Sequence, residues 1–325
     1  MSQNSPTYTF QEFPRDAQAP GAARDRLCPG AQPDRVRIEC RVEGGFFAPA
    51  GVAPKDEIVV MSYNVERGLK MEGQIARLLD PVDLPAPDVI LVSEADRGCS
   101  RTGYRNVMRE MAEALEMNYV YGVEFIELPR WWGKGKRIDS PCEHGNGILS
   151  RYPLGNVRLI RHRKNRSWYG FLQRLFRLGE PRMGGRMALA ADVKVGGRYL
   201  HLYSVHFESG TTNDRFRDDQ ALELAEDAVE KPHGVIIGGD MNTSEYLSDL
   251  RDGTERDGAT RAFRRAGYAD AHAGLPLEAR TTTPSGVAID LLFGKGIVFR
   301  DEGIGTPEQW GGLSDHYPVW ARVRL

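Results

Sequence analysis

Six polar positions end or interrupt the apolar runs of this chain. They are Asn64, Glu94, His206, Asp240 with Asn242, Asp290, and Asp315 with His316. A carboxylate inside a run such as Ile289-Asp290-Leu291 is costly to bury unless it is paired or binds a metal. Any one of these groups could equally be a satisfied polar group of the core. Six of them in one chain are harder to explain separately, so we expect them to converge on one pocket.

Residues 235–242 show the pattern most clearly. A short β-branched run predicts a buried strand, and Gly238 and Gly239 follow it, where the backbone can turn tightly or approach a ligand. Asp240 and Asn242 come next, and side chains two residues apart in an extended segment lie on the same side. The alternative is an Asp/Asn turn that merely closes the strand.

The polar groups predict a reaction class. Carboxylate and carboxamide oxygens without thiolates suit Mg²⁺ or Mn²⁺, which bind through one or two carboxylates together with substrate phosphate. The histidines then act as a base and a phosphate contact rather than as zinc ligands. Such a set suits metal-assisted hydrolysis of a phosphoester by water.

Short strands dominate the elements that must position these groups. We expect strands at residues 58–64, 88–94, 119–128, 144–150, 186–195, 198–206, 288–293 and 319–325. We expect helices at 74–79, 106–115, 215–231 and 259–266, the third burying Phe216, Leu222, Ala225 and Val229. Gly196-Gly197 predicts a hairpin turn, and Gly44-Gly45 could turn a first strand at 35–42. The pattern favours sheets packed on each other with outer helices.

Composition bounds the class of protein. The 325 residues are 41% hydrophobic and 27% charged, with a net charge of −2, as in a soluble globular protein. This charge predicts neither nucleic-acid nor membrane binding. Residues 1–34 read as a loose arm before a single domain at 35–325. The chain has no membrane-spanning window or signal peptide, so a cytoplasmic location is expected.

The four cysteines, Cys28, Cys40, Cys99 and Cys142, have no CxxC spacing. A structural zinc site is therefore not expected. A disulfide would require an oxidising compartment that nothing else in the sequence indicates, so reduced, unpaired thiols are the favoured interpretation.

The order of the polar motifs resembles that of the endonuclease/exonuclease/phosphatase superfamily. The elements are Tyr63-Asn64, Glu94, Gly239-Asp240-Met241-Asn242, Asp290 and Ser314-Asp315-His316, and the resemblance runs over 58–325. It implies an α+β fold of four layers, in which two mixed sheets pack face to face with helices on their outer faces. It also implies a Mg²⁺ or Mn²⁺ cofactor, with Glu94 as the main ligand and Asp315 on the metal side. Asn64 is implied to contact both the metal and the substrate phosphate.

The same resemblance implies the catalytic roles. Asp240 handles a proton or orients the nucleophile, with Asn242 beside it. His316 is the general base or stabilises the phosphate, and Asp290 orients it, as a carboxylate does in hydrolase triads. His206 contacts the phosphate. Which group is the base stays open.

The substrate depends on a basic segment at 158–186. Trp168, Phe171, Leu172, Leu175 and Phe176 have the spacing of an amphipathic helix whose other face is basic. Nucleic acid is the first interpretation, with Arg163, Lys164, Arg166 and Trp168 binding phosphates and bases. A membrane-surface helix serving a phospholipid, sphingomyelin or inositol-phosphate phosphoesterase is the alternative. The segment could also simply pack on its own domain.

Overall fold

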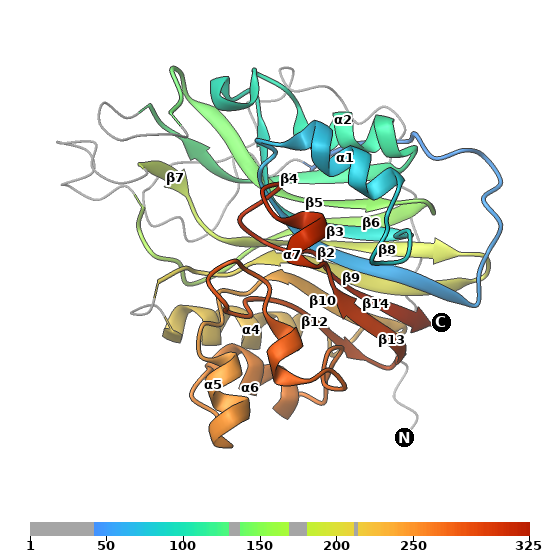
Figure 1. Cartoon of the computed structure of the whole chain (residues 1–325), viewed down its shortest axis with the longest axis vertical. Coiled ribbons are helices and arrows are strands. Elements are labelled where there is room, and N and C mark those ends of the chain that lie inside the picture. Colours follow the sequence, from blue (N-terminus) through green and yellow to red (C-terminus); the bar gives the residue numbers. More distant parts are fainter. Residues whose placement is uncertain (1–41, 130–136, 169–180, 211–213) are drawn as a thin grey trace, which may run out of the picture.

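Two β-sheets lie face to face in the computed structural model, which describes residues 42–129, 137–168, 181–210 and 214–325 (Figure 1). The first sheet runs in the order β1 (Val42–Gly45), β4 (Asn118–Glu127), β5 (Cys142–Ser150), β3 (Val89–Arg97), β2 (Glu57–Arg67), β14 (Val319–Arg324) and β13 (Val298–Ile304), with β7 (Arg182–Gly184) paired to β4. The second runs in the order β11 (Ala269–Asp270), β12 (Asp290–Lys295), β10 (Gly234–Asp240), β9 (Arg198–His206), β8 (Met187–Val195) and β6 (Leu154–Arg161).

Both sheets are mixed. The pairs β2–β3 and β9–β10 are parallel, and the neighbouring pairs are antiparallel. Parallel neighbours present their carboxyl ends at the same edge, which is where the polar residues of the sequence motifs stand. The hairpin of β8 and β9 turns at Gly196-Gly197, as predicted.

Helices cover the outer faces of the sheets (Figure 1). The helices are α1 (Met71–Leu79), α2 (Val107–Leu115), α4 (Asp214–Asp227), α5 (Tyr246–Asp252), α6 (Gly258–Arg265) and α7 (Pro307–Trp310), with 3₁₀ turns at Ser100–Thr102 and Leu277–Arg280. Helices α1 and α2 share a buried cluster with the first sheet, and α4 and α6 share one with the second. A third cluster fills the space between the sheets. The expected four-layer sandwich is confirmed.

The packing of α4 differs from its prediction. Both Leu222 and Val229 were expected in the buried stripe of a helix over 215–231. Leu222 is 49% exposed, and Val229, which is 72% exposed, follows the end of α4 at Asp227. The buried face is formed by Ala221, Leu224 and Ala225, which have the i, i+3, i+4 spacing of one helix face. Small alanines suit this face because the helix packs closely against the sheet and α6.

Several sequence expectations fall outside the described residues. These are the arm at 1–34, the start of the first strand, and the stretch 169–180 that holds most of the expected amphipathic helix. Gly44 and Gly45 belong to β1 itself and pair with β4, so they do not form the expected turn. Among the helices of the described ranges, none is long and apolar enough to span a membrane.

Candidate active site

Three polar side chains form a row across the second sheet. Asp240 ends β10, where the strand register places it opposite His206 of β9 and Asp290 of β12. Gly239 lets the backbone pack this closely, since a Cβ atom there would lie 1.8 Å from the carbonyl oxygen of Val205. The two-glycine stretch of the sequence is thus needed for close strand packing beside the row.

Asn64 joins this row from the first sheet. Its side-chain amide donates a hydrogen bond of 3.1 Å to Asp240 Oδ2. Beside it, the Ser93 and Ser204 hydroxyls each donate to a carbonyl of the facing sheet, at 3.0 and 3.1 Å. Both serines are buried, so these bonds hold the two sheets together where the polar groups meet.

His316 reaches the row from the polar turn before β14. Its Nδ1 lies 2.7 Å from Asp290 Oδ2 and its Nε2 lies 3.8 Å from Asp240 Oδ2. The Ser314 hydroxyl donates to the Asn64 carbonyl at 2.7 Å and accepts the His316 backbone N–H at 3.1 Å. The Ser-Asp-His motif therefore ties its own turn to β2 and fixes the ring of His316.

Carboxylates set the charge of His316. Burial opposes the charged ring, yet Asp290 and Asp240 raise the pKa of His316 from 6.5 to about 10. Burial raises the pKa of Asp290, while the neighbouring His316 acts in the opposite direction. The pair therefore keeps a proton at neutral pH, and His316 Nε2 can donate a hydrogen bond.

Glu94 lies at a break in the ladders that β3 makes with its neighbours, and its φ is 59°. A non-glycine residue in this region costs about 1–3 kcal/mol, so the surrounding packing must impose the conformation. Arg67 Nη1 lies 3.2 Å from Glu94 Oε2. Burial favours protonation, but Arg67 and then His206 hold the pKa of Glu94 well below its ordinary value. Glu94 is therefore a carboxylate.

Asn242 lies beside Asp240, as expected. Its backbone N–H donates to Asp240 Oδ1 at 3.0 Å, and its side chain donates to the Phe207 carbonyl at 3.0 Å. Asp315 is at the rim instead. Its side chain is 54% exposed, and its Oδ1 lies 4.0 Å from His316 Nε2. The metal-side role of Asp315 stays a prediction.

The structure adds His144 and Glu124, which the sequence analysis missed as site residues. The buried His144 of β5 has its Nδ1 2.9 Å from Asp96 Oδ1. Glu124 of β4 is fully buried, with Oε2 3.6 Å from His206 Nδ1. Burial raises the pKa of Glu124, but Arg186 and His206 lower it to about 2.

A sequence signal existed for one of these two residues. Glu124 stands between Val123 and Phe125, which is the pattern of a carboxylate in an apolar run that identified Asp290. His144 precedes a glycine-rich stretch and carries no comparable signal.

The donor atoms fit a divalent metal ion. Within the described ranges, two groups of three residues have ligand atoms within 4.8 Å of one another: Glu94, His144 and His206, and Asp240, Asp290 and His316. Asp290 Oδ1 and His144 Nε2 are buried without a hydrogen-bond partner in this part of the chain. Buried carboxylate oxygens and imidazole nitrogens of this kind are ordinary metal donors.

The predicted substrate-binding residues lie around α4 and β4. Arg163 contacts Glu223 and Glu226, and the Lys164 ammonium lies 2.7 Å from Asp219, so α4 neutralises both. The structure does not bring these two side chains into the row of acids and histidines. Their role in binding substrate stays a prediction.

Arg166 and Trp168 lie closer to the row. The Arg166 guanidinium stacks 4.7 Å from the Trp168 ring, which meets Phe125 edge to face at 6.0 Å. Phe125 follows Glu124 in β4, and the Arg186 guanidinium lies 5.7 Å from the Trp168 ring. Trp168 is thus linked to His206 through Arg186 and Glu124.

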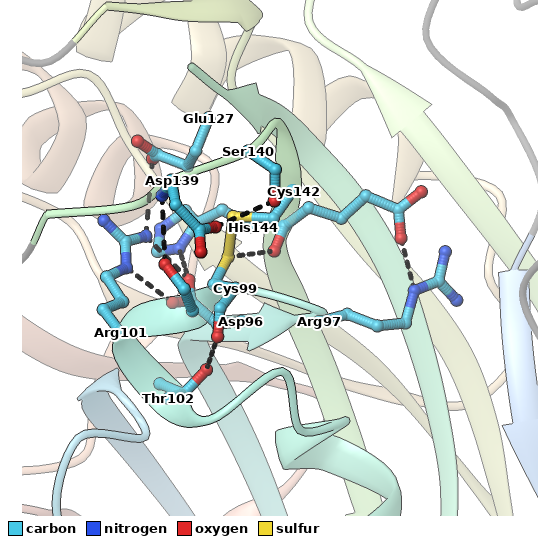
Figure 2. The surroundings of a disulfide bond; sticks show 12 residues. Asp96, Arg97, Cys99, Arg101, Thr102, Glu127, Asp139, Ser140, Cys142 and His144 are labelled. Carbon is cyan, nitrogen blue, oxygen red and sulfur yellow. Dashed lines mark hydrogen bonds and ion pairs between the residues drawn. A yellow bond between two sulfur atoms is a disulfide. The ribbon is translucent and has the colours of Figure 1, made fainter. Parts of the chain in front are cut away.

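A disulfide joins Cys99 and Cys142, which corrects the expectation of unpaired thiols. The two residues are 43 apart in sequence, and only the pairing of β3 with β5 brings them together. Figure 2 shows the disulfide beside the Asp96 and His144 side chains. The expectation of a cytoplasmic location stays a prediction, although disulfides are rare in that compartment. Cys28 and Cys40 lie outside the described residues.

The fold and site define a class of protein, a two-sheet α/β sandwich with an acid–histidine centre at one sheet edge. The family model for the Endonuclease/Exonuclease/phosphatase family matches residues 61–316, and the chain belongs to this family. This match confirms the resemblance that the motifs indicated. Members of the family are phosphoric ester hydrolases. No curated protein matches the chain.

Solved structures share the fold. An endonuclease/exonuclease/phosphatase from Beutenbergia cavernae DSM 12333 is 15% identical, with a TM-score of 0.58 over 83% of this chain and 72% of that one. A humanized D. rerio TDP2 is 17% identical, with a TM-score of 0.55 over 83% of this chain and 100% of that one. The human Nocturnin catalytic domain is 15% identical, with a TM-score of 0.55 over 84% and 96%.

Proposed function

We propose that the protein is a divalent-metal-dependent phosphodiesterase that hydrolyses nucleic acid by attack of water. The observation that carries the proposal is two hydrogen-bonded pairs, Asn64 with Asp240 and His316 with Asp290, which strand register places side by side where the two sheets meet. Family membership supports the hydrolysis of a phosphoric ester.

In this proposal each group of the row has a separate task. His316, which keeps its proton, donates a hydrogen bond from Nε2 to a phosphoryl oxygen and stabilises the charge that develops there. Asp240 accepts hydrogen bonds from Asn64 and from the Asn242 backbone, so its carboxylate is held in place to orient the attacking water.

Glu94 is the main metal ligand of the proposal, with Asn64 and Asp315 on the same side. Burial favours its protonation, but Arg67 and His206 hold the pKa of Glu94 well below its ordinary value, so it is an anion at neutral pH. A divalent cation, Mg²⁺ or Mn²⁺, supplies Lewis-acid polarisation of the phosphoryl oxygens when bound.

Nucleic acid is the proposed substrate for two reasons. A D. rerio TDP2 that is 17% identical, with a TM-score of 0.54, is complexed with single strand DNA product. Arg166 and Trp168 offer a stacked cation and ring on the side of the site near His206, and such pairs suit unpaired bases and phosphates. A phospholipid or inositol phosphate at a membrane surface is the alternative outcome.

The test is hydrolysis of bis-p-nitrophenyl phosphate by the full chain, with and without Mg²⁺ or Mn²⁺. We expect metal-dependent turnover that Glu94→Ala and Asp240→Asn abolish without loss of folding. Asp192→Asn is the matched control, because Asp192 is also a buried carboxylate beside a histidine of the same sheet, away from the row. Full activity in the two site variants would overturn the assignment.

A panel of single-stranded DNA, RNA, sphingomyelin vesicles and inositol phosphates then identifies the substrate. Preferential cleavage of either nucleic acid supports the proposal. If only the vesicles or the inositol phosphates are cleaved, the substrate is a phospholipid or an inositol phosphate, and the nucleic-acid proposal is wrong.

A further inference from the structure

The second group of donors shares only His206 with the row of Asp240, His206 and Asp290. Glu94, His144 and His206 come from β3, β5 and β9, hence from both sheets, and one ligand atom of each lies within 4.8 Å of the others. Both histidines are at most 2% exposed, and the Glu94 side chain is 16% exposed. Nothing in the row's chemistry requires His144 to be there.

Each histidine of the group has a buried carboxylate behind its Nδ1 atom. Asp96 Oδ1 lies 2.9 Å from Nδ1 of His144, and Glu124 Oε2 lies 3.6 Å from Nδ1 of His206. The Nε2 atoms are therefore the ones directed away from these carboxylates. A carboxylate hydrogen-bonded to a histidine is the usual support of a metal-ligating imidazole, because it fixes the ring and raises its basicity. Asp96 gives His144 this support, whereas Glu124 lies beyond hydrogen-bond distance of His206.

The three donors do not satisfy one another. His206 Nε2 is 3.9 Å from Glu94 Oε1, beyond hydrogen-bond distance. His144 Nε2 is completely buried and has no hydrogen-bond partner among residues of the described ranges. Arg67 contacts the other oxygen of Glu94, so Oε1 is the atom on the histidine side. A buried nitrogen without a partner is costly, and a cation between the three atoms would remove that cost.

We propose that Glu94, His144 and His206 bind a divalent transition-metal ion such as Co²⁺ or Zn²⁺. Two imidazoles and one carboxylate favour these ions over Mg²⁺, which prefers oxygen donors. The inference rests on the proposed function in one respect, since Glu94 is also the expected ligand of the hydrolytic metal. The proposed site has two nitrogen ligands, which the oxygen ligands Asn64, Glu94 and Asp315 do not provide. These nitrogen ligands give the site its preference among metal ions.

The test uses Co²⁺ and the metal-stripped full chain, without substrate. Calorimetric titration measures the affinity, and X-ray absorption at the cobalt edge counts imidazole ligands. We expect one tightly bound Co²⁺ with two imidazoles, retained in excess Mg²⁺. His144→Ala should leave one imidazole and weaken binding about 100-fold. Asp96→Asn, which keeps His144, should weaken it about 10-fold, in the range of second-shell ligand changes.

His162→Asn is the matched control. His162 is a buried histidine whose Nδ1 lies 3.0 Å from Glu223, but it belongs to neither three-donor group. The His162→Asn variant should keep the wild-type cobalt affinity and the same number of imidazole ligands. Cobalt bound by oxygen alone, or wild-type binding by both His144→Ala and Asp96→Asn, would overturn the proposal.

The two proposals fail separately. Magnesium-dependent hydrolysis without imidazole-bound cobalt would refute the nitrogen site and leave the phosphodiesterase standing. Imidazole-bound cobalt in a protein that hydrolyses no phosphodiester would support the nitrogen site and refute the phosphodiesterase.

Discussion

The two donor groups touch, because His206 Nε2 lies 3.5 Å from Asp240 Oδ2, yet they are built differently. In the group of Asp240, Asp290 and His316, the histidine is bonded to a member of its own group at 2.7 Å. In the group of Glu94, His144 and His206, each histidine is instead backed by a carboxylate outside the group. A self-bonded group can hold and deliver a proton, whereas a group supported only from outside is arranged to receive an ion.

The largest expected effect is on turnover. His316→Gln should lower kcat about 10³-fold, because it removes the charged donor to the phosphoryl oxygen. Cobalt ligation by His144 and His206 should stay the same, since His316 belongs to the other group. Loss of both properties in this variant would show that the two groups act as one unit.

Breaking the Cys99–Cys142 disulfide should weaken metal binding by the group of Glu94, His144 and His206. Cys99→Ser should lower the free energy of unfolding by about 2–4 kcal/mol, because the bond closes a loop of 43 residues. Urea unfolding of wild type and variant measures this. Cobalt affinity should fall more than magnesium-dependent turnover, since Asp96 and His144 lie near the two cysteines in sequence. An equal decline in cobalt affinity and in turnover would contradict the separation of the two donor groups.

The group of Asp240, Asp290 and His316 should also make the free energy of unfolding depend on pH. The pKa of His316 is raised from 6.5 to about 10, so the folded state binds its proton more tightly than the unfolded state. The resulting stabilisation is complete below about pH 6.5 and is lost as the pH rises toward 10, with a slope of up to about 1.4 kcal/mol per pH unit. Unfolding measured across this range should lose that slope in His316→Gln. An unchanged slope would refute the proton assignment.

The smallest effect is expected in the basic segment. The triple substitution of Arg163, Lys164 and Arg166 by Ser should raise KM for single-stranded DNA about 3- to 10-fold and make binding less salt-dependent. Hydrolysis of bis-p-nitrophenyl phosphate should not change, because Arg163 and Lys164 are paired with acids of α4 and Arg166 stacks on Trp168, all outside the row. Equal losses on the two substrates would mean that the segment is structural.

Most of the row could be predicted from local signals. Asn64, Asp240 and Asp290 are polar residues at the ends of apolar, strand-forming runs, and such a position is unfavourable unless the side chain has a specific partner. The alternation of strands and short helices likewise sufficed for the layered fold.

Other features depend on which strands become neighbours. His144 reaches Glu94 only because β5 pairs with β3, and Cys99 meets Cys142 through the same pairing. The buried face of α4 depends on the position of α6, so the apolar residue Leu222 is on the surface.

The sequence by itself determined the class of fold, the order of the motifs and most of the hydrolytic row. Each of these follows from the polarity and spacing of residues close together in the chain. The tertiary structure alone decided that Asp96 lies behind His144 and Glu124 behind His206. It also decided that acids of α4 neutralise Arg163 and Lys164. The reason is physical: burial and charge pairing across strands depend on register and sheet contact, which join residues that are far apart in the sequence.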